Sequence, residues 1–169
     1  MAFSSTVNKV EAIFLEKAFK YKSNSGTIIT QPKHFRIGNK DFIVFGAGER
    51  LKILNRRGSD RVIVNDKIRF SKNQIYLHQN KFTTTNTLGQ LIQVNTKGEK
   101  LTKQLILSEN HVIDATSKTL VTLDDNKLQI RANTVDLDFG DYTNPQIFYL
   151  NDKIYVTTTD LQTKKIYLF

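Results

Sequence analysis

Apolar and polar residues alternate in short runs along most of this chain. Around residue 52, Leu51, Ile53 and Asn55 fall on one side of the alternation, and Lys52 and Leu54 fall on the other. A period of two is typical of a β-strand. With the turn signals around it, this pattern predicts four strands in one stretch, at residues 34–38, 41–46, 50–55 and 61–64.

The same stretch recurs 40 residues later. The matched pairs are Leu51 with Leu91, Leu54 with Val94, Asn55 with Asn95 and Gly58 with Gly98. The register extends upstream without a gap, so Phe42 falls on Phe82, Ile37 on Leu77 and Phe35 on Ile75. Self-similarity with a period near forty residues indicates a repeat fold in which neighbouring units share a core.

Two further copies follow. Ile130 lies 36 residues after Val94, and Leu168 lies 38 residues after Ile130. The only two prolines, Pro32 and Pro145, stand 113 residues apart at the same repeat position. Proline lacks an amide donor, so it fits just ahead of a strand.

These observations predict an all-β fold built from β-propeller-type repeats, about four four-stranded blades. The blades form either a complete small propeller or part of a larger one. The predicted repeats are residues 31–72, 73–109, 110–143 and 144–169. The last repeat reaches only its third strand, so we expect its blade to lack an outer strand.

Residues 1–30 lie outside the repeats. The pattern at residues 10–15 predicts a strand, and the pattern at residues 27–30 predicts one more clearly. One of these segments would supply the outer strand missing from the last blade and close the ring. Alternatively, residues 10–21 form an amphipathic helix whose apolar stripe is Val10, Ile13, Phe14, Ala18 and Tyr21. Lys17 falls on that stripe, which favours the strand.

The pattern Pro-x-x-Φ-x-Φ, followed by a hairpin and by Lys-x-Φ-x-Φ-x-x-x-Gly, resembles the repeats of quinoprotein-like β-propellers. The resemblance covers residues 31–169. The sequence of residues 35–44 is also similar to that of uncharacterised repeat proteins of Bacteroidetes. The enzymes among the quinoprotein-like proteins carry tryptophan docking motifs, and this chain has no tryptophan. The resemblance therefore transfers no cofactor ligands.

Composition excludes several classes of site. The chain has no cysteine, which rules out disulfides and thiolate chemistry. No apolar run is long enough for a membrane helix, and the first twenty residues lack the pattern of a secretory signal, so we expect a soluble chain of unassigned location. Histidines His34, His78 and His111 share no repeat position and no metal-binding spacing. We expect no metal and no cofactor.

Charge is distributed unevenly. Residues 1–105 carry 19 Lys and Arg against 7 Asp and Glu, a net charge of +12, whereas residues 106–169 carry 6 against 9, a net charge of −3. Asp136, Asp138 and Asp141 fit a charged outer edge strand better than a calcium loop, because the third acid is displaced. Such an asymmetry can steer an acidic partner or a second copy.

The densest basic cluster lies in the first repeat. Its candidate residues for binding an anionic partner are Arg50, Lys52, Arg56, Arg57 and Arg61. Arginines can neutralise phosphates, but only Phe70 offers a stacking surface within residues 50–72. A solvated rim is the simpler interpretation of this cluster.

No nucleophile elbow, phosphate loop or paired metal ligands occur in the sequence. We therefore expect a non-enzymatic interaction or scaffold module. Its partner would be a protein, another part of a larger propeller or a second copy. The alternatives are an electrostatic binder of nucleic acid or another anionic polymer, using the first repeat, and part of a propeller enzyme.

Overall fold

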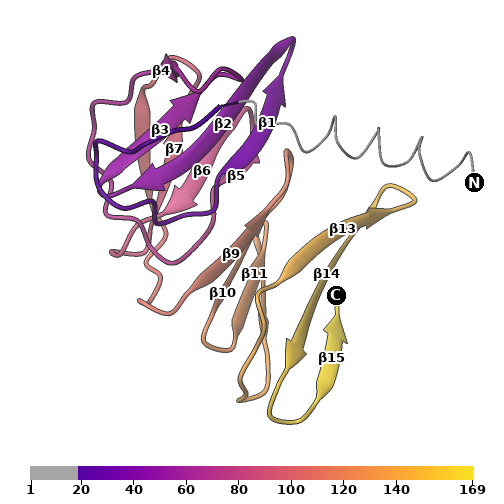
Figure 1. Ribbon diagram of the computed structural model, residues 1–169. Coiled ribbons are helices and arrows are strands. Elements are labelled where there is room, and N and C mark those ends of the chain that lie inside the picture. The colour runs from indigo at the N-terminus through magenta and orange to yellow at the C-terminus, as the bar shows by residue number, and fades with distance from the viewer. Residues whose placement is uncertain (1–18) are drawn as a thin grey trace, which may run out of the picture.

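The computed structural model describes residues 19–169, and it confirms an all-β fold (Figure 1). The first sheet contains β1 (Lys33–Ile37), β2 (Lys40–Ala47), β3 (Arg50–Leu54) and β4 (Asp60–Val62). The second contains β5 (Tyr76–His78), β6 (Lys81–Thr85), β7 (Gln90–Val94) and β8 (Lys100–Gln104). The third contains β9 (Val112–Ala115), β10 (Leu120–Asp124), β11 (Lys127–Ile130) and β12 (Asn133–Asp136). The last contains β13 (Gln146–Leu150), β14 (Lys153–Asp160) and β15 (Lys165–Leu168).

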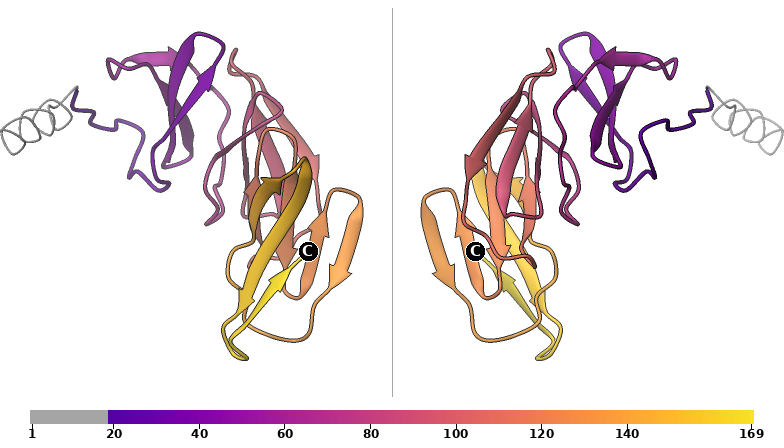
Figure 2. Two further views of the ribbon diagram at one scale, coloured as in Figure 1. Left: turned by 90° about the vertical axis from the view of Figure 1, so that its right-hand side faces the viewer. Right: turned by 90° about the vertical axis from the view of Figure 1, so that its left-hand side faces the viewer.

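Each sheet is an antiparallel meander whose strands pair in chain order. The four sheets follow one another as blades of a β-propeller, and Figures 1 and 2 show the succession from indigo to yellow. The first strand of each sheet lies on the inner side, where β9 contacts both β5 and β13. No helix among residues 19–169 is long and apolar enough to cross a membrane.

Strand positions in the first repeat match the alternation closely. The sequence predicted 34–38, 41–46, 50–55 and 61–64, and each observed strand begins and ends within two residues of its prediction. The β1–β2 hairpin turns through Gly38 and Asn39. Gly38 has a φ of +59°, a left-handed conformation that glycine adopts without steric cost.

The first two sheets share the larger apolar core. The Phe42 and Phe82 rings meet with centroids 5.4 Å apart, and Phe35 lies 5.9 Å from Phe82. The buried cluster consists of Phe42, Val44, Leu51, Ile53, Val64, Ile68, Phe70, Ile75, Phe82, Ile92 and Val94. The apolar positions of both repeats therefore face one another across this interface.

This packing corrects the predicted repeat register in the inner hairpin. Phe42 is the second residue after Lys40, which closes the β1–β2 hairpin, whereas Phe82 is the first residue after the equivalent Lys81. Successive side chains of a strand point to opposite faces. Phe42 and Phe82 consequently lie on opposite faces of their own sheets, and they are not equivalent positions.

The interface between the second and third sheets is polar. Asn73 donates to Thr85 Oγ1 at 3.0 Å and to the His111 carbonyl at 3.2 Å, and it accepts from the Ile113 amide at 3.0 Å. The His111 ring is fully buried, with Nε2 2.7 Å from Thr85 Oγ1. Hydrogen bonds therefore join the second and third sheets, whereas apolar side-chain packing joins the first two sheets.

The third and last sheets share a smaller apolar core. Its buried members are Val121, Leu123, Leu128, Leu137 and Val156. At the inner side, the Tyr149 hydroxyl donates to Thr119 Oγ1 at 2.9 Å, and the Ile147 amide donates to Asp114 Oδ2 at 2.7 Å. Apolar packing and inner-edge hydrogen bonds both hold these two sheets together.

The segment from residue 19 to residue 30 covers the outer face of the first sheet. The Tyr21 ring packs edge-on against Phe45 at 5.4 Å, and Phe45, Ala47 and Leu54 are buried beneath it. Ile28 forms a single bridge with Ala47. The expectation that residues 27–30 close the ring is wrong, because this segment lies along the first sheet. The predicted strand at 10–15 and most of the alternative helix lie outside the described residues.

Among residues 19–169 the last sheet has three strands, so the described part of the chain supplies no outer strand to this blade, as the sequence predicted for the last repeat. Within residues 19–169, no hydrogen bond and no buried cluster joins the first sheet to the last. These two sheets lie at the two ends of the succession (Figure 1). Residues 19–30 cover the outer face of the first sheet, whereas no described residue covers the outer face of the last sheet.

Candidate functional sites

The structure separates the five basic residues that the sequence singled out. Arg50 begins β3, whereas Arg56 follows its end, so about six residues of extended chain, roughly 20 Å, lie between them. Arg50 donates to the Asn65 carbonyl, and Lys52 pairs with Asp60 at 3.1 Å. These two residues therefore lie apart from the other three.

Arg56, Arg57 and Arg61 come together at the β3–β4 turn. With Asn55 they line a hollow of about 320 Å³. Arg56 Nε lies 3.2 Å from Asp41, a nearly buried carboxylate that also contacts His34 and Arg36. The hydrogen bond from His34, with the charges of Arg36 and Arg56, holds the pKa of Asp41 below its usual range.

The inner strands bring three ionisable groups near one another. Lys33 Nζ lies 4.4 Å from the centre of the Tyr76 ring, and the Tyr76 hydroxyl donates to the Ile113 carbonyl at 3.0 Å. Burial raises the pKa of Tyr76 to about 12 and also raises the pKa of Asp114, while it lowers the pKa of Lys33. Backbone amides of Ala115 and Ile147 satisfy the Asp114 carboxylate, so this group links adjacent sheets.

The three histidines lie in separate structural contacts. His34 pairs with Asp41 at 2.9 Å, and His78 Nδ1 donates to the Thr116 carbonyl at 2.7 Å. His111 Nδ1 donates to the Ser108 carbonyl at 2.5 Å. In the described part of the chain, no three His, Asp or Glu side chains are grouped to hold a metal.

The predicted acidic edge is only partly a strand. Asp136 ends β12, the outermost strand of the third sheet, but Asp138 and Asp141 lie in the loop beyond it. The Asp138 carbonyl accepts from the Tyr142 hydroxyl at 2.6 Å, and the Asp141 amide donates to Asp160 at 3.2 Å. The three carboxylates therefore do not share one face.

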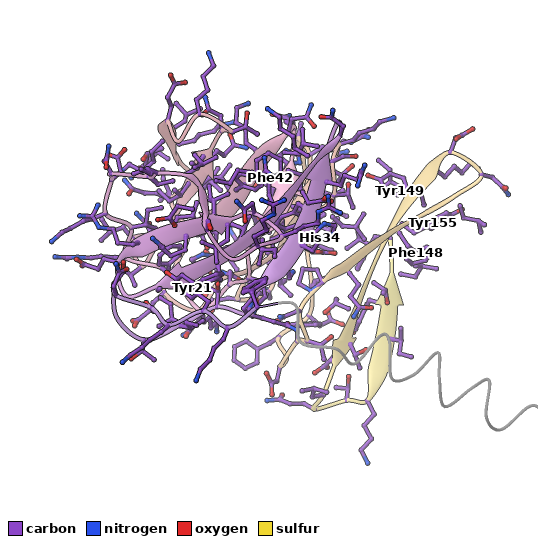
Figure 3. The ribbon with its side chains drawn as sticks, turned by 45° about the horizontal axis from the view of Figure 1, so that its top comes forward. Tyr21, His34, Phe42, Phe148, Tyr149 and Tyr155 are labelled. Atoms are coloured by element: carbon purple, nitrogen blue, oxygen red, sulfur yellow. The ribbon has the colours of Figure 1, made fainter. Side chains whose placement is uncertain are left out.

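The uncovered face of the last sheet is an apolar surface that the sequence analysis missed. We call it the open face; its apolar residues are Phe148, Leu150, Tyr155, Ile166 and Leu168. Phe148, Leu150, Ile166 and Leu168 are 42%, 56%, 76% and 59% exposed. Phe148 and Tyr155 stack with ring centroids 5.3 Å apart, and Figure 3 shows both rings on the last sheet.

The signal for the open face was present in the sequence. The offset of 113 residues between Pro32 and Pro145 also relates Phe35 to Phe148 and Phe42 to Tyr155. Phe42 is 3% exposed in the structure, so the counterpart of Tyr155 in the first sheet is a buried position.

Comparison with known proteins adds no relative. No protein-family model matches the chain, and no curated protein matches it. Functional conclusions therefore rest on the residues and the geometry described above.

Proposed function

We propose that this chain is a non-enzymatic interaction module that binds protein through the open face of its last sheet. The partner is a second copy of the same chain, with the two open faces packed together. The observation that carries this proposal is the exposure of an apolar sheet face whose repeat counterpart is buried. Large exposed apolar patches typically mark interaction sites.

The registers of the two end sheets support this equivalence. Phe35 pairs with Phe42 across β1 and β2, and Phe148 pairs with Tyr155 across β13 and β14. Both hairpins close at a lysine that pairs with an apolar residue, Ile37 or Leu150. In the first sheet this face contacts the second sheet, so the same face of the last sheet has the side chains that sheet-on-sheet packing requires.

A second copy satisfies the geometry best in a two-fold arrangement. A head-to-tail contact would need a bare outer face on the first sheet, but Tyr21 covers Phe45 there. In every copy, no residue from 19 to 169 covers the open face. Two copies related by a two-fold axis present the same patch to each other, which is the commonest symmetry of soluble oligomers.

The size of the open face sets the expected affinity. The three strands have five, eight and four residues; at a spacing of about 4.8 Å and a rise of about 3.3 Å per residue, they cover a patch of roughly 14 by 19 Å on average. Such a patch is smaller than the roughly 800 Å² per partner of a standard specific interface, so the contact belongs with weak, transient ones. We therefore expect a dimer that dissociates in the micromolar range.

The module's non-enzymatic character is supported by the roles of its polar groups. His78 and Asp114 bond to backbone groups next to or in the adjacent sheet, and His111 Nε2 bonds to Thr85 Oγ1, so all three residues hold sheets together. The resemblance to quinoprotein-like propellers remains a prediction about ancestry and adds no reacting group. A scaffold role follows from rigid stacked sheets that present a defined surface.

Light scattering coupled to gel filtration, over a range of loading concentrations, tests the proposal. We expect the mass to rise from 19.4 kDa towards twice that value as concentration increases. The double substitution I166K/L168K places two positive charges on β15, the outer strand of the open face, and should keep the chain monomeric at all concentrations. Both side chains are more than half exposed, so the fold should tolerate the change.

The matched control is I63K/L101K, which makes the same replacements at exposed positions of the first and second sheets. It should dimerise like the unmodified chain. A chain that stays monomeric at several hundred micromolar, or an I166K/L168K variant whose mass profile is unchanged, would contradict the proposal.

A further inference from the structure

The arginine hollow at the β3–β4 turn has a composition suited to an anion. Its lining residues are Asn55, Arg56, Arg57 and Arg61, three guanidinium groups without a carboxylate. Arginine presents a planar set of donors that matches the oxygens of a phosphate group. The site is distinct from the open face, which lies on the last sheet.

Two of the three arginines at this turn lack an ion-pair partner. Four other basic side chains of the first two repeats have carboxylate partners: Lys52 with Asp60, Lys67 and Arg69 with Glu49, and Lys100 with Asp66, at 3.1 to 3.5 Å. Within residues 19–169, Arg57 and Arg61 have no carboxylate within 4.0 Å. The charges of these two arginines are therefore not neutralised by an ion pair with the described part of the chain.

The backbone of the turn is held in place by Asn55. Its side-chain Oδ1 accepts from the Arg57 amide at 2.8 Å and from the Ser59 amide at 3.2 Å, and its carbonyl accepts from the Gly58 amide at 3.0 Å. Arg57 thus extends from a fixed point. A site whose donors are already positioned loses less entropy when a ligand binds.

Two of the arginine side chains are also oriented. Arg56 is tied to the nearly buried Asp41, and the Arg61 guanidinium lies over the Phe42 ring at 5.3 Å. Phe42 is buried at the core of the first two sheets, so Arg61 has a rigid base. These contacts orient the guanidinium groups of Arg56 and Arg61 beside the hollow before any ligand binds.

A second, less polar hollow adjoins the first and shares Arg61. It has a volume of about 210 Å³ and is lined by Ile37, Lys40, Phe42, Arg61, Val62 and Thr96. The two hollows together would accept a phosphate joined to an apolar group. Phosphotyrosine has this combination, with an aromatic ring directly attached to the phosphate ester.

We propose that this double hollow binds a phosphotyrosine-bearing segment of a partner protein, with the phosphate among Arg56, Arg57 and Arg61 and the ring against Ile37 and Val62. Recognition of phosphorylated motifs by arginine clusters is a recurrent mode of peptide binding. Single-stranded nucleic acid fits less well, because it needs exposed aromatic rings for base stacking. Phe42 is 3% exposed, and Arg61 covers its ring.

Fluorescence anisotropy with a labelled Gly-Ser peptide that carries one central phosphotyrosine tests the proposal. We expect binding that weakens as salt rises and that the unphosphorylated peptide does not show. The double variant R57A/R61A should weaken binding at least about tenfold, because charge-assisted arginine contacts to phosphate are lost. Thermal unfolding of the variant verifies that it remains folded.

The matched control is K127A/R131A, which removes two exposed positive charges from the third sheet and should bind like the unmodified chain. As a measurement that needs no variant, phenyl phosphate added to the unmodified protein should shift the Nε–H nuclear magnetic resonance signals of Arg57 and Arg61. Three results would each overturn the proposal: no binding of the phosphopeptide, equal binding by R57A/R61A, or tighter binding of an oligouridylate of equal charge.

Discussion

At the scale of single residues, two neighbouring threonines on β6 differ in the hydrogen bonding of their hydroxyl groups. Thr84 is 3% exposed, and its Oγ1 is the only buried side-chain polar atom without a partner among the described residues. Thr83 is fully buried too, but its hydroxyl donates to the Lys81 carbonyl at 3.0 Å and accepts from Gln93. A buried hydroxyl without a partner keeps the cost of its lost hydration.

Thr84→Val should therefore stabilise the protein by about 1 kcal/mol, since valine has a similar shape and no hydroxyl. Thr83→Val is the matched control, and it should destabilise the protein by about 1 kcal/mol because it removes a satisfied hydroxyl. Urea unfolding followed by circular dichroism measures both changes. Equal effects of the two substitutions would contradict this account.

Residue-scale prediction of the basic site was incomplete for a geometric reason. Arg50 and Arg56 are six positions apart in the sequence, but an extended strand carries them to opposite ends of the sheet. The β3–β4 turn then brings Arg61 back beside Arg56 and Arg57. Density of charge along a sequence cannot show such a division, because it depends on where a strand ends and the chain reverses.

At the scale of elements, the loop before β5 fastens the second sheet to the third. Asn73, 5% exposed, contacts Ser71 and Thr85 on the second sheet side and the backbone of His111 and Ile113 on the other. Its removal would leave the Ile113 amide buried without an acceptor. A buried donor left without an acceptor lowers the free energy of unfolding by about 1–3 kcal/mol.

Asn73→Ala should consequently destabilise the protein by about 2 kcal/mol, with the loss centred on the contact between these sheets. Chemical denaturation gives the size of the effect, and amide exchange at Ile113 gives its location. Asn110→Ala, at an exposed position of the adjoining loop, should change stability by less than about 0.5 kcal/mol. A loss below that value for Asn73→Ala would show that the network is dispensable.

Strand order followed from the sequence, whereas the facing of side chains in the second repeat did not. Alternation located β1 to β4 because each run of apolar residues was bounded by a turn signal. The repeat alignment then paired Phe42 with Phe82, although the two rings face each other across an interface. A displacement of one residue reverses the face of every side chain in a strand, and an ungapped alignment does not detect it.

At the scale of the whole molecule, two apolar cores are separated by a polar boundary. The first and second sheets share eleven buried apolar residues, and the third and last share five. In stacked repeats each unit is stabilised by its neighbours, so the pair with the larger core should open last.

Native-state hydrogen exchange should therefore divide the chain near residues 105–111, the loop between β8 and β9. Amides of β2, β3 and β6 should open with a free energy at least about 1 kcal/mol higher than those of β10 and β14. Exchange should be followed below the concentration at which the chain associates, since a dimer would protect the last sheet. A single opening free energy for all four sheets would argue against two cores.

The cover over the first sheet has a consequence for solubility. A molecule with a bare face at both ends could add copies without limit, and such non-closing contacts lead to fibres. Tyr21 packs against Phe45 and so covers one of the two faces through which copies could associate. If the open faces pair as proposed, assembly would stop at two copies, and residues 19–30 would prevent the chain from growing into filaments.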